Sequence, residues 1–401
     1  MKILFIHDNF PAQFGALGAY LSTKGWQVRF ATAFEGVKPG DNRFLQYKKH
    51  REPTDGIHPY AFNFEKVVIN GQAAARAMLT ASEAGYRPDI VMAHSGWGAS
   101  AFVRDIWPDV KFIPYLEWWY NYPAPDEVSM GTHEPDLHAQ LMQRCRNAPF
   151  MIDMTGAAVN LCPTQYQASQ FPPELREKLT IMHDGIDMKL HAPATAPVTE
   201  AAGLKVGDMP EVITYFTRGM EPHRGFPQFM RALSILQAKR PGIHAIIGGK
   251  DRVAYGRQLP EGESWKQRML KELEGKLDLS RIHFCGLQPR PEYVKVLQAS
   301  QAHIYLTADF VLSWSMLDSM AIGCPLVVSD CAPVTEYMTE GETGLMVGLH
   351  DHEALAIRIE EALERPEDMK AMGLNARALM SELCDQEKIY PAKDQMLRDM
   401  L

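Results

Sequence analysis

The sequence lacks the short motifs by which several enzyme classes are recognised. It has no GxGxxG and no GxxxxGK[ST], so it carries no fingerprint of a dinucleotide-binding dehydrogenase or a P-loop NTPase. It has no HExxH and no GxSxG, which argues against a zinc protease and an α/β-hydrolase. A DxD pair, a short carboxylate motif that holds a divalent metal, is absent too. We therefore expect chemistry that needs neither a metal nor another cofactor.

Cysteine and long apolar runs are also scarce. The six cysteines form no CxxC, and Cys162 and Cys285 lie inside apolar runs, as buried thiols in a reducing compartment do. The N-terminal MKILFIHDNF has an apolar run too short for a signal peptide, and no run reaches the length of a bilayer span. The sequence predicts a cytoplasmic protein, with at most peripheral contact at the inner face of the membrane.

The chain has no excess of positive charge. Its 41 Lys and Arg against 49 Asp and Glu give a formal net charge of −8, which argues against nucleic-acid binding. An anionic ligand remains compatible with this balance, because a few arginines at one site suffice. At 401 residues the chain exceeds one ordinary core, so we expect two domains.

Short apolar runs alternate with helix-period segments along the whole chain, which is typical of parallel sheets covered on both faces by helices. The predicted strands are KILFIHD, WQVRFATA, DIVMAH, KFIPYLE, AAVNLCP and LTIMHDG in the first half, and VITYFTR, HAIIGG, IHFCG, AHIYLT and PLVVSD in the second. The predicted helices include 14–24, 73–84, 225–239, 265–273, 292–299 and 352–365.

The stretch from His191 to Pro210 is rich in Ala, Pro and Gly and lacks periodicity, so we expect it to link the domains. In open α/β sheets ligands bind at the carboxyl ends of the strands. Two such domains facing one another would hold a ligand in the cleft between them.

The segment LTADFVLSWSMLDSMAIGCP, residues 306–325, combines a strand end, a helix start and one carboxylate. Amides near Ser313, Trp314 and Ser315 would present a phosphate site at the helix N-terminus. Asp318, one turn further on, would accept hydrogen bonds from a nucleotide's sugar. The alternative is that a serine caps a core helix and Asp318 complements its dipole.

TRGMEPHRGF places Arg218 and Arg224 on a loop after a predicted strand. Guanidiniums donate bidentate hydrogen bonds to phosphate, so the pair is a candidate diphosphate clamp; the alternative is a solvated surface loop. Gly249 in IIGGKDR and Gly15 in NFPAQFGALG would allow close approach of a ligand, although each signal is weak alone.

His94 and Glu117 end two predicted strands of the first half. Glu117 precedes Trp118, Trp119 and Tyr120, and an acid beside aromatic rings suits a sugar, although the same aromatic residues would also suit a core.

Together these segments resemble a family 4 retaining glycosyltransferase of the GT-B fold over nearly the whole chain. MKILFIHDNFPAQF is similar to the family's opening strand and loop, MHDGIDMKLHAP to its "pNGVDxxxFxP", and TRGMEPHRGF to its Arg…Lys phosphate pair. IHFCGLQP, with Gly286, is similar to its "flG" turn, and MLDSMAIGCPLVVSD to "LLEAMAcGxPVVatd"; FVLSWSMLDSMA suggests a subgroup.

The chain departs from the family at the first of two glutamates that are separated by seven intervening residues. The second aligns with Asp318, but the first aligns with Phe310, which accepts no hydrogen bond; Asp309 is the neighbouring acid that would replace it. By resemblance the second acid binds ribose and the first contacts the donor sugar. Relatives often carry a histidine in place of Glu117.

The resemblance implies two doubly wound Rossmann-like domains, 1–195 on the acceptor side and 196–375 on the nucleotide-sugar side, with 376–401 crossing back. It implies metal-free transfer of a sugar, with retention, from a nucleotide-sugar to a glycan, lipid-linked or small-molecule acceptor in glycan or polysaccharide biosynthesis. The implied roles are catalysis for Arg218, Arg224, His94 and Glu117, and donor binding for Asp318 and its helix start. An epimerase acting on nucleotide-sugars and a catalytically silent binding subunit remain open as alternatives.

Overall fold

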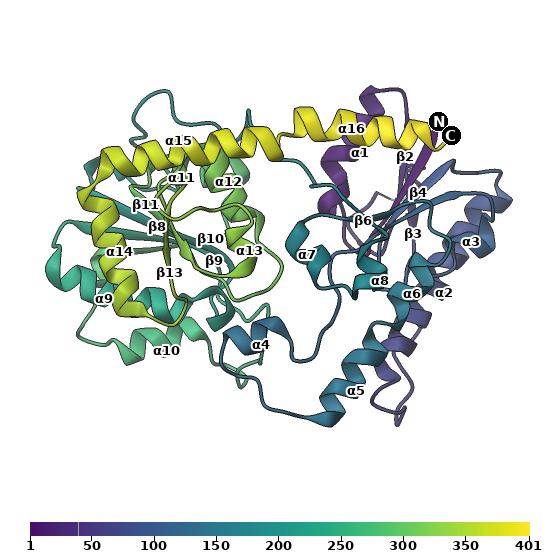
Figure 1. Cartoon of the computed structure of the whole chain (residues 1–401), viewed down its shortest axis with the longest axis horizontal. Helices are drawn as coiled ribbons and strands as arrows, with labels where there is room; N and C mark the ends of the chain where they lie inside the picture. Colours follow the sequence, from purple (N-terminus) through teal and green to yellow (C-terminus); the bar gives the residue numbers. More distant parts are fainter. Residues whose placement is uncertain (39) are drawn as a thin grey trace. The chain divides into compact units, whose positions relative to one another are not determined.

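The computed structural model describes residues 1–38 and 40–401 and divides into two compact units (Figure 1). The first unit comprises residues 1–124, 134–185 and 387–401, and the second comprises residues 125–133 and 186–386. Each unit contains one parallel sheet flanked by helices, so the predicted α/β class with two Rossmann-like domains is confirmed.

The sheet of the first unit has seven parallel strands in the order β3-β2-β1-β4-β5-β6-β7. Their bounds are β1 Lys2–Ile6, β2 Gln27–Thr32, β3 Phe44–Gln46, β4 Ile90–His94, β5 Lys111–Tyr115, β6 Asn160–Cys162 and β7 Leu179–Ile181. The central strand β1 pairs through Ile3 with Val28 on one side and with Ile90 on the other. The strand order therefore reverses between β1 and β4.

The helices of the first unit are α1 Gly15–Thr23, α2 Phe62–Glu83, α3 Val103–Ile106, α5 Leu137–Arg146, α6 Ala148–Met154, α7 Gln165–Ser169, α8 Pro173–Arg176 and α16 Gln386–Asp399. The predicted helix at 73–84 is the second half of α2, and α5 was not predicted. The side chain of Asp136 accepts the His138 amide and so caps the start of α5.

The sheet of the second unit has six parallel strands in the order β10-β9-β8-β11-β12-β13, reversing between β8 and β11. Their bounds are β8 Glu211–Gly219, β9 Ile243–Lys250, β10 Ile282–Gly286, β11 Ala302–Tyr305, β12 Leu326–Ser329 and β13 Leu345–Val347. The helices of this unit are α4 Pro125–Ser129, α9 Phe226–Lys239, α10 Trp265–Glu272, α11 Arg290–Ala299, α12 Trp314–Ile322, α13 Ala332–Thr335, α14 His352–Glu364 and α15 Pro366–Leu383.

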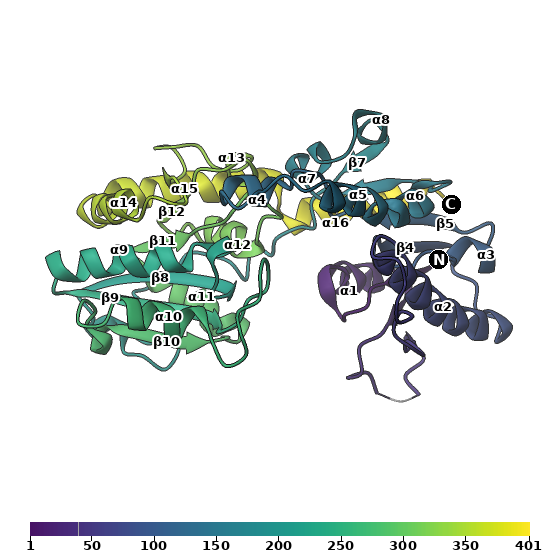
Figure 2. The ribbon, with the colours of Figure 1, turned by 90° about the horizontal axis from the view of Figure 1, so that it is seen from below.

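Alternate residues of β8 pack into different cores. Ile213 and Tyr215 contact the core of α9 and α14, whereas Val212 and Phe216 contact that of α11, which lies on the other face of the sheet (Figure 2). This alternation follows from the twofold repeat of a strand. Helices therefore cover both faces of this sheet.

The predicted linker at 191–210 is part of the second unit. Ala201 and Val206 are buried in the core beside α11, because a few apolar side chains suffice to dock an irregular segment. The chain changes unit between Gly185 and Ile186, upstream of the predicted boundary at 195, and residues 125–133 belong to the second unit although no sequence pattern indicated it.

Residues 387–401 belong to the first unit, and Tyr390 and Leu397 are buried in its core. The buried Lys393 ammonium lies 3.5 Å from the carboxylate of Asp184, which also accepts a hydrogen bond from the Tyr115 hydroxyl. Among the described residues, no helix combines the length and the apolar character that a bilayer crossing requires.

Candidate functional site

A pocket of about 290 Å³ lies at the carboxyl ends of β8, β9 and β10 in the second unit. This is the edge of an open α/β sheet at which ligands bind, next to the reversal of strand order between β8 and β11. The residues that line this donor pocket are Phe216, Thr217, Arg218, Gly249, Gly286, Leu287, Gln288, Arg290, Tyr293, Ser313, Trp314, Ser315 and Asp318. The pocket thus brings together seven of the predicted site residues.

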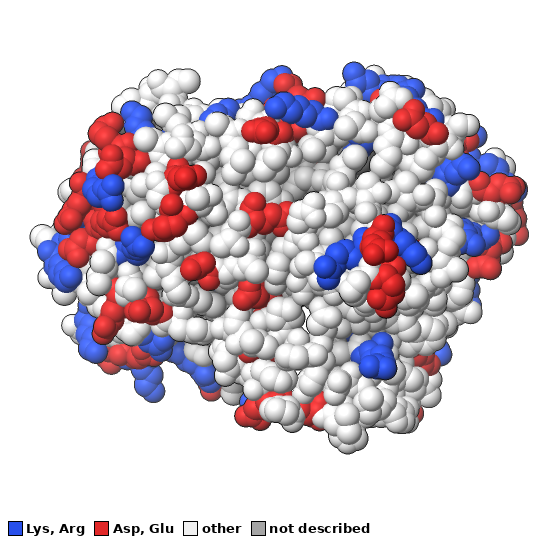
Figure 3. Space-filling model, viewed as in Figure 1, with Lys and Arg blue, Asp and Glu red and all other residues white. Residues whose placement is uncertain are grey.

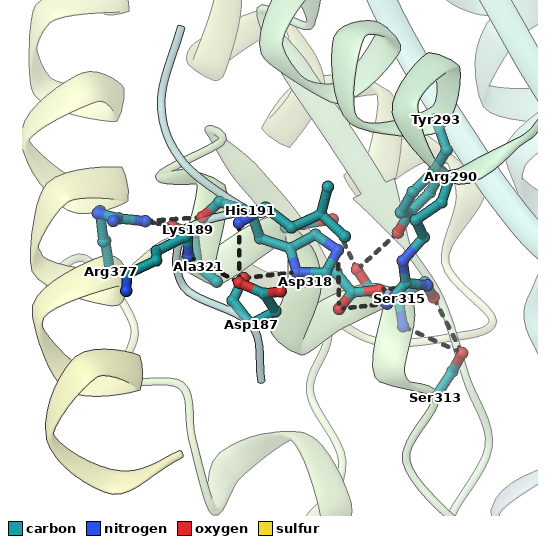
Figure 4. A network of polar contacts seen from close by, with 12 residues as sticks. Asp187, Lys189, His191, Arg290, Tyr293, Ser313, Ser315, Asp318, Ala321 and Arg377 are labelled. Atoms are coloured by element: carbon teal, nitrogen blue, oxygen red, sulfur yellow. Dashed lines mark hydrogen bonds and ion pairs between the residues drawn. The ribbon is translucent and has the colours of Figure 1, made fainter. Parts of the chain in front are cut away.

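Asp318 lies on α12 with its carboxylate buried between two basic side chains (Figure 4). One oxygen lies 3.3 Å from a guanidinium nitrogen of Arg290, whose side chain is half exposed. The other accepts a hydrogen bond from the second guanidinium nitrogen of Arg290 at 3.4 Å and lies 3.5 Å from Nε2 of His191, which donates no hydrogen bond to it. The carboxylate therefore retains capacity to accept a hydroxyl from the pocket.

The tautomer of His191 explains why this histidine donates no hydrogen bond to Asp318. Its Nδ1 lies 3.0 Å from the backbone oxygen of Asp187, and a nitrogen facing a carbonyl must carry the proton. Burial lowers the pKa of His191 to about 4, so at neutral pH the ring is neutral and Nε2 carries no proton. Burial likewise raises the pKa of Asp318 to about 7, against the opposing charge of Arg290.

The start of α12 is as predicted, with Ser313 as the N-cap. Its hydroxyl accepts the Ser315 amide at 3.4 Å, and the Ser313 amide donates to the Tyr305 hydroxyl at 2.9 Å. Trp314 is 46% exposed beside this start. The capping alternative is thus correct for Ser313, and the same helix start also lines the donor pocket.

The two predicted arginines occupy different environments. Arg218 lines the donor pocket at the end of β8, with a guanidinium nitrogen 3.5 Å from the Tyr255 hydroxyl. Arg224 is buried, and it donates to the Thr307 hydroxyl at 2.6 Å and contacts the Tyr305 hydroxyl at 3.4 Å. Among residues 1–38 and 40–401, no carboxylate lies within 4.0 Å of its guanidinium, so its buried charge has no ion-pair partner.

The glycines of the donor pocket are required by the backbone. Gly249 has φ of +128°, and a Cβ there would lie 2.1 Å from the Thr217 carbonyl oxygen. Gly286 has φ of +66° with open space where a Cβ would point. Gly15, predicted beside a phosphate or sugar, lies in the first unit at the start of α1, and a Cβ there would meet Pro11 at 2.5 Å.

Asp309 was expected to replace the missing first glutamate. In the structure its carboxylate accepts the Ala332 amide at 2.9 Å and so binds the start of α13. The ring of Phe310 packs against Tyr255, with centroids 5.4 Å apart. Neither residue lines the donor pocket, because the chain turns between β11 and α12.

In the first unit, His94 and Glu117 come together at the ends of β4 and β5. Nε2 of His94 lies 3.1 Å from the Glu117 carboxylate, and the ring of His7, which follows β1, packs edge-on against His94 at 4.9 Å. Burial lowers the pKa of His7 to about 3, so this ring is neutral at physiological pH. Sequence reasoning identified His94 and Glu117 but not His7.

Arg290 and Tyr293 were also missed. They occupy the first two turns of α11, which follows the Gly286 turn, and Tyr293 contacts the backbone oxygen of Ser315 at 3.4 Å. Arg290 directly follows Pro289, and a basic residue at a helix start opposes the helix dipole. That unfavourable position was the signal available in the sequence.

Two family models match the chain, one in each half. The model of the glycosyl transferase family 4 group matches residues 24–191, and that of glycosyl transferases group 1 matches residues 203–379. The chain is therefore a glycosyltransferase of the GT-B fold, and its first half is similar to the family 4 group.

This glycosyltransferase shares 21% identity over 311 residues with a D-rhamnosyltransferase of Pseudomonas aeruginosa, covering 74% of this chain and 76% of the relative. It shares 24% identity over 206 residues with a D-inositol 3-phosphate glycosyltransferase of Corynebacterium glutamicum, covering 50% of this chain and 47% of the relative, or about half the length of each. Among solved structures, HepE of Anabaena in complex with UDP-glucose has a TM-score of 0.70 at 16% identity, and all of both chains is covered.

Proposed function

We propose that the protein transfers a sugar, with retention of configuration, from a nucleotide-sugar donor to an acceptor hydroxyl. The observation that carries this proposal is Asp318, a buried carboxylate beside the start of α12 that contacts the Arg290 guanidinium and keeps lone pairs for a further donor from the pocket. A carboxylate one turn inside a helix whose first amides line the same pocket suits a ribose hydroxyl next to a phosphate.

The cations of the second unit suit a diphosphate leaving group. Arg218 lines the donor pocket, and the buried guanidinium of Arg224 holds a positive charge without a carboxylate within 4.0 Å among the described residues. A buried charge without a partner is costly, and an incoming phosphate would offset that cost. Stabilising the charge that develops on the leaving diphosphate is the main catalytic role that we assign to the two arginines, with the start of α12.

Arg290 has a separate role in this proposal. Its guanidinium contacts Asp318 from a half-exposed position and compensates the carboxylate when no nucleotide is bound. Since these arginines and the helix start supply positive charge, we propose that transfer is independent of a divalent metal. Turnover that is unchanged by a chelator would support this assignment.

His94 and Glu117 are proposed to contact the sugar or the acceptor. Their hydrogen bond at the ends of β4 and β5 fixes the imidazole beside the carboxylate. We assign retention to attack by the acceptor hydroxyl on the face of the sugar from which the diphosphate leaves. The departing phosphate takes the acceptor proton, so the proposal needs no nucleophile from the protein. His94 and Glu117 would then select the acceptor rather than form a covalent intermediate.

The relatives guide the substrate class. The P. aeruginosa relative is a D-rhamnosyltransferase, the C. glutamicum relative acts on D-inositol 3-phosphate, and HepE was solved with UDP-glucose. We propose that the donor is a hexose-type nucleotide-sugar and that the acceptor is a glycan, a lipid-linked molecule or a small molecule in glycan or polysaccharide biosynthesis. We also propose that the protein is cytoplasmic and contacts the membrane at most peripherally. Acidic and basic side chains are intermixed on the face shown in Figure 3.

Thermal shift with UDP, GDP, ADP, CMP and dTDP tests the donor site, because a ligand of the folded state raises its stability. We expect one nucleotide to raise the Tm of the wild type but not that of Asp318→Ala. Asp351→Ala, which removes a helix cap of the same unit outside the donor pocket, is the matched control and should keep the shift. An equal shift in wild type and Asp318→Ala would refute the ribose assignment.

A silent binding subunit is the second candidate, because Phe310 stands where a donor-contacting glutamate is expected. It would bind nucleotide through Asp318 yet release no free nucleotide from any donor and acceptor pair. An epimerase would instead convert a donor without any acceptor, and NMR of the donor incubated with the protein separates that case from transfer.

A further inference from the structure

A second pocket, of about 220 Å³, lies at the carboxyl ends of β1 and β4 in the first unit. We call it the basic pocket; it is lined by Asp8, Lys49, Asn63, Lys66, Val67, Gly96, Trp97, Tyr120, Arg146 and Pro149. It lies where the strand order of its sheet reverses, the place at which an open α/β sheet binds a ligand.

The three cations of the basic pocket come from distant segments. Lys49 follows β3, Lys66 lies on α2 and Arg146 ends α5. Among the residues that the structure describes, none of the three forms an ion pair.

Neighbouring cations of the same unit are paired. Lys48 lies 3.7 Å from Glu35, and Arg51 lies 2.8 Å from Glu65. Lys49, Lys66 and Arg146 differ from these two neighbours in having no carboxylate partner among the described residues, and the mutual repulsion of three cations at one pocket would be relieved by a bound anion.

The remaining polar groups of the pocket are held in place. The guanidinium of Arg146 lies 3.5 Å from the centroid of the Tyr120 ring, which orients its donors. The carboxylate of Asp8, the one acid of the lining, accepts the Tyr47 hydroxyl at 2.6 Å and the Asn70 amide at 2.9 Å. With three cations and one carboxylate the lining carries a net charge of +2.

We propose that the basic pocket binds a phosphate monoester group carried by the acceptor; this inference rests on the proposed transferase function. A phosphate monoester carries about −1.5 to −2 charges at neutral pH, which matches the lining, whereas a carboxylate would leave one cation uncompensated. Asp8 is the acceptor for a hydroxyl of the same molecule. Gly96 and Trp97 of the pocket follow His94 in the chain, so the bound phosphate lies close to the group assigned to sugar or acceptor contact.

The experiment titrates the full-length protein with glucose 6-phosphate, glucuronate, glucose and inorganic phosphate by calorimetry at low ionic strength, in the presence of the nucleotide found by thermal shift. We expect glucose 6-phosphate to bind, glucuronate to bind more weakly and glucose not to bind. Lys49→Gln and Lys66→Gln should each weaken glucose 6-phosphate roughly tenfold, because each removes one charge-assisted hydrogen bond. Lys48→Gln, the same change next to Lys49 but outside the lining, should bind like the wild type.

Equal binding by wild type, Lys49→Gln and Lys66→Gln would overturn the proposal, since the anion would then lie elsewhere. Glucuronate binding as tightly as glucose 6-phosphate would overturn the phosphate assignment. Binding of inorganic phosphate together with no binding of glucose 6-phosphate would overturn the assignment to the acceptor. If the nucleotide fails to bind while glucose 6-phosphate binds through Lys49 and Lys66, the proposed transferase function fails and the anion site stands.

Discussion

Replacing Asp318 by Asn should stabilise the protein while weakening nucleotide binding. Burial raises the pKa of Asp318 from 3.8 to about 7, so the folded state disfavours the charged form. A group whose folded pKa lies above its unfolded pKa makes stability fall as pH rises between the two values. The penalty is absent below pH 4 and complete above pH 7, and an asparagine of the same shape does not incur it.

The size of the effect follows from this pKa change. A change of one pKa unit corresponds to about 1.4 kcal/mol, which gives an upper value of roughly 4 kcal/mol at pH 8. Solvent around the half-exposed Arg290 reduces that value, so we expect about 2 to 4 kcal/mol. For a unit of this size the gain corresponds to a Tm increase of roughly 5 to 10 °C.

Thermal and urea unfolding of the wild type and Asp318→Asn between pH 4 and pH 8.5 measures the gain. The two curves should coincide near pH 4 and separate as pH rises to about 7. Asp278→Asn is a control of opposite sign, because hydrogen bonds from Ser280 and Arg281 lower the pKa of Asp278 to about 2, so its loss should cost stability at neutral pH. Equal stability of the wild type and Asp318→Asn at pH 8 would refute the reasoning that desolvation of the Asp318 carboxylate outweighs its contacts with Arg290.

The remaining predictions concern the leaving group and the C-terminal segment. Arg218→Ala and Arg224→Ala should each lower kcat roughly a hundredfold with little change in nucleoside affinity. Arg231→Ala, which removes a surface ion pair, should leave kcat unchanged. Steady-state kinetics measures kcat, and titration with nucleoside measures the affinity. Lys393→Met should cost about 3 to 5 kcal/mol in urea unfolding, because it leaves Asp184 buried without its cation, and adding Asp184→Asn should restore most of the loss. No recovery in the double variant would show that Lys393 acts through packing instead.

Those parts of the fold that depend on local pattern were predictable from the sequence. The strand, turn and capped helix around Ser313 follow from residue periodicity and a capping residue, and the structure has them within a residue or two. Arg218, Gly249 and Gly286 meet at one pocket because parallel strands bring their carboxyl ends to one edge.

Contacts between distant segments were not predictable in the same way. The contact of Asp318 with Arg290 and the basic pocket of Lys49, Lys66 and Arg146 depend on how helices dock, and nothing in one segment's pattern specifies its partner. Asp309 was expected at the donor because of its place in the chain, but the turn after β11 directs its carboxylate to α13 instead.

The return of the last helix to the first unit affects how the protein can be divided and recombined. A chimera that joins the front half of this enzyme to the back half of a relative would normally take the C-terminus from the relative. Here residues 387–401 supply Tyr390 and Leu397 to the first core and Lys393 to the buried Asp184. The final fifteen residues should therefore come from the same parent as the N-terminal segments, with the junction between Gln386 and Glu387.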